Sequence, residues 1–247
     1  SALGLNLLAG PFPREDCVEF AEDRFLGEWL PGHIGRKGLM LDVGAHHGWS
    51  LEPFAKAGWE IHAFEPDPSN RKQLERRFGK SPNVTINSSA VDETGGAKLP
   101  FYTSQESTGI SSLNNFRDTH KSVGEVSTVS LRDYCSDKGI SQVDFIKIDV
   151  EGYDFFALRG FPWETLSPQF VIIEFEDLKT KRLGYSWSDI ADFLQEKGYT
   201  VLVSEWHPIV RYGQAHDWRQ FAKYPCTLAS PEAWGNLVAF NNGLDLE

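Results

Sequence analysis

The sequence predicts an α/β fold with a mostly parallel central sheet, and two observations lead to that prediction. From residue 39 onward, short runs rich in Val, Ile, Leu and Phe alternate with amphipathic stretches, which is the order of βαβ units. Phe145-Ile146 and Val171-Ile172-Ile173 are continuously apolar, as expected of strands that helices cover on both faces. With 40% hydrophobic residues, the 247-residue chain can bury a core.

The predicted elements follow one another in a regular order. Strands are expected at 39–43, 61–65, 84–88, 143–148, 170–175, 200–204 and 236–240. Helices are expected at 50–57, 69–78, near 153–159 and around 189–197. Residues 1–38 are expected to form an N-terminal helical extension, and 39–247 one domain. Insertions are expected at about 97–131, with a hairpin arm and a β-like run at 126–131, and at 206–233, which is rich in aromatic residues.

Charge balance and cysteine content argue against several classes of protein. The chain has 35 acidic and 24 basic residues, a formal charge of -11, which repels a nucleic-acid backbone. Its apolar runs are far shorter than the roughly 18 residues that a membrane span needs. The three cysteines are widely spaced and form no CxxC pair, which favours a reducing compartment. We therefore expect a cytoplasmic protein without nucleic-acid partners or a membrane span.

A glycine-rich turn after the first predicted strand is the first functional feature. Residues 42–48 read Asp-Val-Gly-Ala-His-His-Gly, so a strand ends in an acidic residue and enters a turn that opens a helix. Glycines let the backbone approach a ligand closely, and the helix start offers N–H groups. The next strand ends in Glu65, 21 residues after Gly44, where a carboxylate can accept hydrogen bonds from both ribose hydroxyls. The pattern predicts a cofactor that contains a nucleoside.

The spacing of the turn distinguishes between two kinds of cofactor. Gly44-x-x-x-Gly48 lacks the middle glycine of the dinucleotide motif, which lets a pyrophosphate lie against the backbone. The turn therefore favours S-adenosylmethionine, with Asp42 or Asp149 near its amino group or sulfonium. An NAD(P)-dependent Rossmann oxidoreductase is the first alternative, and a non-catalytic cofactor-binding partner of a glycosyltransferase is the second.

At these positions the sequence resembles the FkbM-type S-adenosylmethionine-dependent methyltransferases over residues 39–174. The motifs are Asp42-Val43-Gly44-Ala45, Phe64-Glu65-Pro66, Ala90-Val91 with Gly95, the Ser/Thr/Gly loop at 107–113 and, most specifically, 144–152 (Asp-Phe-Ile-Lys-Ile-Asp-Val-Glu-Gly) followed by Leu158-Arg159-Gly160. One departure is His46-His47, where the family commonly has Asn and an aliphatic residue.

The resemblance implies a fold, a reaction and a cofactor site. The fold is the class I methyltransferase fold, Rossmann-like, with a seven-stranded sheet of order 3-2-1-4-5-7-6, helices on both faces and an antiparallel last strand. The reaction is O-methylation of a hydroxyl on a sugar, glycan or small natural product. The expected cofactor-binding residues are Asp42, Gly44, Ala45, His46, Gly48, Glu65, Pro66, Ser89, Ala90 and Asp149.

A hydroxyl acceptor must be activated, because it is a poor nucleophile at neutral pH. Asp149, Glu151 and Glu174 follow or end neighbouring strands and are candidate catalytic residues, which could bind a divalent cation. Alternatively, Glu174 pairs with Lys147 or an arginine, and a side-chain base such as His207, which begins the aromatic insertion, takes the proton. The metal-free route is our prediction, and the cation remains the alternative.

Overall fold

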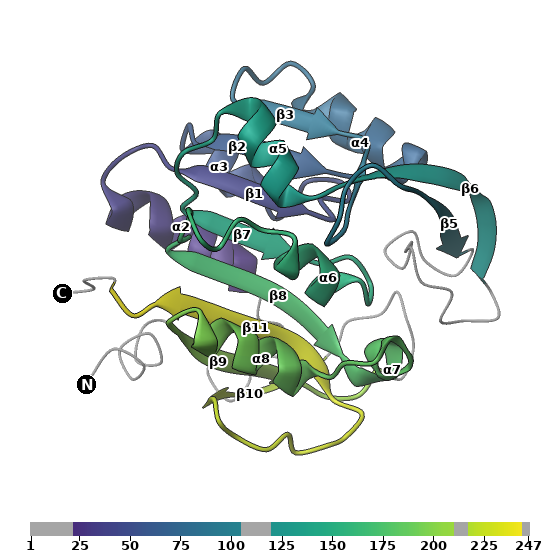
Figure 1. The fold of residues 1–247 in the computed structure, drawn as a ribbon. Helices are drawn as coiled ribbons and strands as arrows, with labels where there is room; N and C mark the ends of the chain where they lie inside the picture. Colours follow the sequence, from purple (N-terminus) through teal and green to yellow (C-terminus); the bar gives the residue numbers. More distant parts are fainter. Residues whose placement is uncertain (1–21, 105–119, 210–216, 244–247) are drawn as a thin grey trace.

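The computed structural model describes residues 22–104, 120–209 and 217–243, and its centre is an eight-stranded sheet (Figure 1). The strand order is β10-β9-β11-β8-β7-β1-β2-β3. The strands are β1 (Leu39–Val43), β2 (Glu60–Phe64), β3 (Val84–Asn87), β7 (Phe145–Ile148), β8 (Phe170–Glu176), β9 (Tyr199–Trp206), β10 (Trp218–Lys223) and β11 (Trp234–Asn241).

Strand directions reproduce the expected class I topology. β3, β2, β1, β7 and β8 run parallel, whereas β11 pairs antiparallel with both β8 and β9. The order β3-β2-β1-β7-β8-β11-β9 is thus the predicted 3-2-1-4-5-7-6 order with an antiparallel last strand. This confirms the predicted fold class.

The sequence prediction was one strand short. β10 pairs antiparallel with β9 at the sheet edge and comes from the segment 206–233, which we had expected to be an insertion. None of its six residues is buried. Its sequence, Trp-Arg-Gln-Phe-Ala-Lys, has neither an apolar run nor an apolar–polar alternation, so it gave no strand signal.

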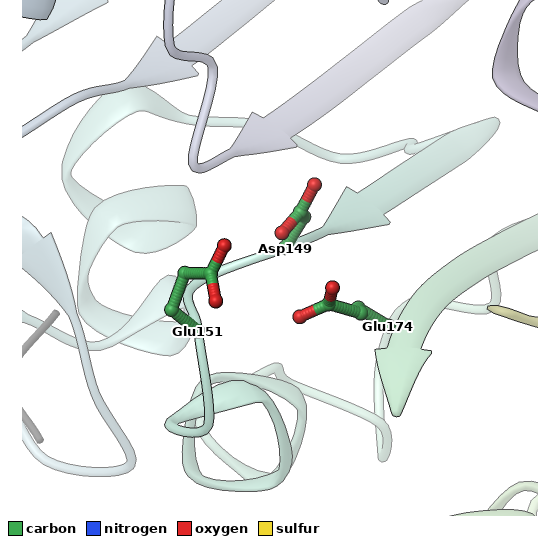
Figure 2. Close-up of side chains that lie close together, drawn as sticks. All are labelled: Asp149, Glu151 and Glu174. Carbon is green, nitrogen blue, oxygen red and sulfur yellow. The ribbon is translucent and has the colours of Figure 1, made fainter. Parts of the chain in front are cut away.

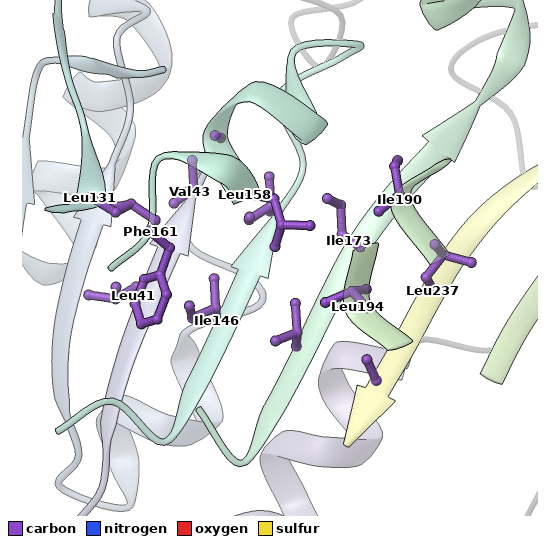
Figure 3. Packing of buried hydrophobic residues seen from close by; sticks show 14 of the residues in the cluster. Leu41, Val43, Leu131, Ile146, Leu158, Phe161, Ile173, Ile190, Leu194 and Leu237 are labelled. Carbon is purple, nitrogen blue, oxygen red and sulfur yellow. The ribbon is translucent and has the colours of Figure 1, made fainter. Parts of the chain in front are cut away.

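Helices cover both faces of the sheet. α5 (Leu131–Lys138), α6 (Asp154–Arg159) and α8 (Trp187–Glu196) pack against one face, and α2 (Glu22–Ile34), α3 (Glu52–Lys56) and α4 (Pro68–Phe78) against the other. Alternate strand residues point to opposite faces, so Leu41 and Ile146 join the first core and Met40 and Phe145 the second. Figure 3 shows the first core, with Leu158 of α6 and Leu194 of α8 above the strands.

α5 corrects another expectation. The β-like run was expected to reach Leu131, but Ser130 caps a helix there, accepting a hydrogen bond from the N–H of Asp133 at 3.0 Å. Gly139 ends α5 in the left-handed conformation, with φ 64°. The strand prediction was wrong at this point because the capping serine stops the ladder.

The segment 97–131, predicted as an insertion, contributes two strands to a separate three-stranded sheet. β5 (Lys98–Ser104) is the predicted hairpin arm and pairs antiparallel with β6 (His120–Val129), which also pairs with β4 (Ala90–Val91). The Ser/Thr/Gly loop at 107–113 lies outside the described residues. β5 brings Phe101 to the edge of the main sheet where the parallel strands end.

α2 packs against the main sheet. Leu26 and Leu30 are buried in the second core beside Phe54 of α3. The carboxylate of Glu22 accepts hydrogen bonds from Trp206 Nε1 at 3.3 Å and Asn236 Nδ2 at 3.2 Å. Among the described helices, none is both long and apolar enough to cross a membrane.

Candidate active site

Strand register brings the predicted site residues into one row. Val43 lies opposite both Phe64 and Ile148, and Ile148 lies opposite Ile173. The next residues along β2, β1, β7 and β8 are therefore neighbours across the sheet: Glu65, Gly44, Asp149 and Glu174. Ligands of open α/β sheets bind at this carboxyl edge of the strands.

A cavity of about 320 Å³ opens at the row, within the size range of small-molecule sites. Its walls include these residues from the predicted sets: Gly44, Ala45, His46, Glu65, Pro66, Ser89, Ala90, Asp149, Glu151 and Glu174. Asn70, Phe101, Lys147 and Tyr153 also line it. Residues assigned from separate motifs thus surround one space.

Glu65 connects the tip of β2 to the glycine-rich turn. Its Oε2 accepts a hydrogen bond from the N–H of His46 at 2.8 Å, and its Oε1 accepts one from the N–H of Asp67 at 2.8 Å. Burial raises the pKa of Glu65 to about 7, against the opposing effect of these two hydrogen bonds. The carboxylate therefore gains or loses its charge near neutral pH.

His46 has a backbone and a charge state that suit a turn beside a ligand. Its φ is 48°, in the left-handed region that side chains rarely adopt, and its ring stacks on that of His47 with centroids 3.8 Å apart. Burial and the neighbouring His47 lower the pKa of His46 to about 4. The ring is therefore neutral at pH 7.

Three residues of the turn lie in different surroundings. Gly44 has a φ of 82°, and a Cβ there would lie 1.8 Å from the backbone oxygen of Asp149. Gly48 packs against α4, where a Cβ would lie 2.6 Å from Leu74 Cδ1. Asp42 is fully buried and accepts a hydrogen bond from Ser50 Oγ at 3.1 Å. Gly48 and Asp42 therefore lie outside the cavity wall, and they contact α4 and Ser50, respectively.

Lys147 lies between the turn and Asp149. Its Nζ donates to Asp149 Oδ2 at 3.3 Å and to the backbone oxygen of Gly44 at 3.4 Å, and lies 3.8 Å from Asp42 Oδ1. Lys147 thus pairs with Asp149, which follows β7, and approaches Asp42 of β1, whereas the lysine 3.1 Å from Glu174 is Lys179. The ammonium lies on the cavity wall.

Glu151 is presented by a strained loop. Its φ of 57° is left-handed, which is uncommon for a residue with a side chain and recurs at functional sites. Asp154 accepts hydrogen bonds from the N–H groups of Val150 at 2.9 Å and Gly152 at 2.8 Å, and Tyr185 Oη donates to the Gly152 oxygen at 2.7 Å. The loop directs the Glu151 carboxylate towards Asp149 and Glu174 (Figure 2).

A buried lysine that the sequence analysis missed contacts three carboxylates at and beside the cavity. Lys179 of α7 (Asp177–Thr180) lies 2.5 Å from Glu151 Oε2, 3.1 Å from Glu174 Oε2 and 2.9 Å from Glu176 Oε2. Burial nevertheless raises the pKa of Glu151 to about 7 and that of Glu174 well above its usual value, although Lys179 opposes both shifts. Lys179 stands three residues after Glu176 in the sequence, and this spacing was the available signal.

His207 is not brought to the cavity. It follows β9, its side chain is exposed, and its Nδ1 lies 2.9 Å from the Arg219 guanidinium. β11 and β8 lie between β9 and β7 in the sheet. A strand-end position was therefore insufficient to place this residue, because the antiparallel β11 separates it from the site.

Trp49 is a second residue that the sequence analysis missed. It lines the cavity although 66% of its surface is exposed. The Arg77 guanidinium carbon lies 3.7 Å from the ring centroid, and Arg77 is itself held by Glu52 at 2.6 Å and by the His47 backbone oxygen at 2.5 Å. The indole is thus held at the rim by a fixed cation.

The fold and the cavity define an α/β protein with a ligand-sized cavity at the strand tips, and comparison with known proteins assigns it to a family. The sequence matches the Methyltransferase FkbM domain family over residues 42–201, more than half of the chain. The chain belongs to the FkbM methyltransferase family. This membership decides against the NAD(P)-dependent oxidoreductase that the turn left open.

Solved structures with a similar fold include several methyltransferases. An rRNA methylase from Streptococcus thermophilus is 8% identical, with a TM-score of 0.48 over 91% of this chain and 99% of that chain. The magnesium protoporphyrin IX methyltransferase of Synechocystis PCC 6803, with bound SAM, is 14% identical, with a TM-score of 0.42 over 89% of this chain and 77% of that chain. No curated protein matches the sequence.

Proposed function

We propose that the protein binds S-adenosylmethionine in the strand-tip cavity and methylates a hydroxyl of a small-molecule or glycan acceptor. The row from Glu65, just after β2, to Glu174 on β8 crosses three strand spacings, roughly 14 Å. An elongated ligand with a nucleoside at one end and an amino acid at the other suits such a row.

The residues of the row fit the chemical groups of this cofactor. The Glu65 carboxylate is available to the ribose hydroxyls, and Asp149 to the amino group. The turn at Gly44 lets the backbone run directly against the ligand, since no Cβ projects from it. When bound, the cofactor supplies an electrophilic methyl group on a positively charged sulfur. The protein then has to position the acceptor and take its proton.

The observation that favours a hydroxyl acceptor is the buried carboxylate of Glu151 in the cavity wall. Its pKa of about 7 suits a general base that must hold and release a proton near neutral pH. The acceptor oxygen forms the new bond to the methyl carbon, the carbon–sulfur bond breaks with its electrons kept by sulfur, and the hydroxyl proton passes to a Glu151 carboxylate oxygen. Glu151 thus replaces His207 as the proposed base.

A labelled-methyl assay over glycosides and small hydroxylated acceptors tests the proposal. Glu151→Gln should lower kcat about 10²- to 10⁴-fold, while calorimetry finds an unchanged affinity for S-adenosylhomocysteine. Glu196→Gln, at the exposed end of α8, is the control and should behave as wild type. Methyl transfer only to RNA or to amines would contradict the hydroxyl acceptor. Full activity of Glu151→Gln would contradict Glu151 as the general base. Cofactor binding without any methyl transfer would support the non-catalytic alternative.

A further inference from the structure

The buried ammonium of Lys179 takes no direct part in the proposed methyl transfer. Only 2% of its side chain is exposed, and its partners Glu151, Glu174 and Glu176 are buried as well. Burying a charge costs far more than burying a neutral group unless partners compensate for it. Two of those partners line the cavity, so the lysine is directly connected to the site.

The same carboxylates have the geometry of a cation site. One oxygen each from Asp149, Glu151 and Glu174 lie within 4.8 Å of one another (Figure 2). A divalent ion bound to the oxygens of Glu151 and Glu174 would lie within a few ångströms of the Lys179 ammonium, which already contacts these oxygens at 2.5 Å and 3.1 Å. Two cations that close repel strongly in a buried site. Glu151 and Glu174 therefore have room for one cation between them, while Asp149 already pairs with Lys147 at 3.3 Å.

The short helix α7 holds the lysine on its inner side. Leu178, the preceding residue, is 66% exposed, whereas Lys179 points inward. Asp177 accepts a hydrogen bond from the N–H of Trp187 at 2.9 Å, which connects α7 to the start of α8. Because α7 directly follows β8, its position is set by the strand that carries Glu174 and Glu176.

On the basis of the proposed methyl transfer, we propose that the Lys179 ammonium is the internal cation of this site. It occupies the place of a divalent ion and acts as a positioning residue that holds Glu151 beside the transferring methyl. Wild-type turnover accordingly requires no added metal. The lysine itself touches neither acceptor nor cofactor and acts through the Glu151 carboxylate.

Cation binding tests this assignment without any acceptor. Lys179→Ala removes the ammonium and leaves the carboxylates, so this variant should bind about one Mn²⁺ per chain by calorimetry, and Mn²⁺ should raise its melting temperature. Wild type should show neither effect. Lys181→Ala is the matched control, because Lys181 is exposed and lies 3.6 Å from Asp177 outside the cavity. This readout stays informative even if the acceptor is not a hydroxyl.

Turnover tests the positioning role. Lys179→Ala should lower kcat about 10- to 100-fold with the acceptor KM unchanged, as when a group that orients a reacting residue is lost. Lys179→Arg keeps a cation and should retain kcat within tenfold. In the Glu151→Gln variant, adding Lys179→Ala should lower kcat little further, because the lysine acts through Glu151.

Two results with the wild-type protein would overturn the assignment: tight Mn²⁺ binding, or turnover that EDTA abolishes and Mn²⁺ restores. Two results with Lys179→Ala would also overturn it: full kcat in the presence of EDTA, or a folded variant that binds no Mn²⁺. If Lys179→Ala does not fold, the Lys179→Arg variant decides the question. An arginine variant that folds and has a kcat within tenfold of wild type supports the internal cation, whereas an unfolded or inactive arginine variant contradicts it.

Discussion

At the scale of single residues, burial determines the charge states in the site. Glu65 and Glu151 both have a pKa raised to about 7, with burial as the largest cause in each case. Their partners differ, because backbone N–H groups hold Glu65 and an ammonium holds Glu151. Proton uptake at Glu65 should therefore affect cofactor binding, and proton uptake at Glu151 should affect turnover.

The affinity for S-adenosylhomocysteine should fall as the pH drops below about 7. A pKa raised to about 7 means that Glu65 is protonated below that pH, whereas ribose hydroxyls bind the ionised form. Binding must then release a proton, and the affinity should fall by up to about tenfold per pH unit. Calorimetry between pH 5.5 and 8.5 measures this dependence.

Glu65→Gln should weaken binding at least about tenfold at pH 8 and remove most of the pH dependence, because it removes a charge-assisted contact worth roughly 1.5–3 kcal/mol. Glu196→Gln should keep the wild-type profile. A wild-type affinity that is constant across this pH range would exclude Glu65 from the cofactor contacts.

At the scale of elements, the close approach of two strand tips determines which residue the turn accepts. The backbone after β1 passes so near the backbone after β7 that a Cβ on Gly44 would lie 1.8 Å from the Asp149 oxygen. Gly96 has nearly the same φ, 85° against 82°, yet nothing lies within 4 Å of its Cβ position. Substitutions at these two glycines therefore distinguish the cost of a left-handed backbone, which both share, from the cost of a steric clash, which only Gly44 has.

Gly44→Ala should destabilise the protein far more than Gly96→Ala. The left-handed conformation alone costs about 1–2 kcal/mol and is common to both variants. The clash with Asp149 adds to that at Gly44, so a total above about 3 kcal/mol is expected there. Urea unfolding measures both losses. Equal losses would mean that the strand tips separate easily and that the turn is not rigid.

At the scale of the whole molecule, one sheet is covered by helices from distant parts of the chain. The sequence suggested residues 1–38 as an extension of the domain 39–247. α2, within that extension, places Leu30 in the second core beside Phe54. Glu22 also binds Trp206 and Asn236, near the far end of the chain. We propose that α2 belongs to the same cooperative unit as the sheet.

Leu30→Ala should lower the free energy of unfolding by about 2–5 kcal/mol, the usual cost of truncating a buried leucine. Leu178→Ala is the control, since that leucine is 66% exposed and its loss should cost under about 0.5 kcal/mol. Urea unfolding should show a single transition for each protein. A separate early transition, or no loss for Leu30→Ala, would make α2 an independent extension.

The alternation of apolar and amphipathic segments was sufficient to predict β1, β2, β3, β7 and β8. β1, β2, β7 and β8 are largely buried, so their composition reflects their position. The edge strand β3 alternates Val84 and Ile86, which pack against the second core, with polar residues. β10 was missed because its apolar residues, unlike those of the edge strand β3, do not alternate with polar ones. α5 was missed because one capping serine turned a β-like run into a helix. Local patterns therefore predicted the core strands and β3, and failed at the edge strand β10 and at the start of α5.

For the site, the sequence by itself determined that Gly44, Glu65, Asp149 and Glu174 end neighbouring strands, because parallel strands expose their carboxyl ends at one edge. Only the tertiary structure decided which charges meet. It paired Lys147 with Asp149 and placed Lys179 among Glu151, Glu174 and Glu176. It also left His207 beyond β11. These contacts join residues on different elements, and side-chain direction and burial, which no local pattern carries, decide them.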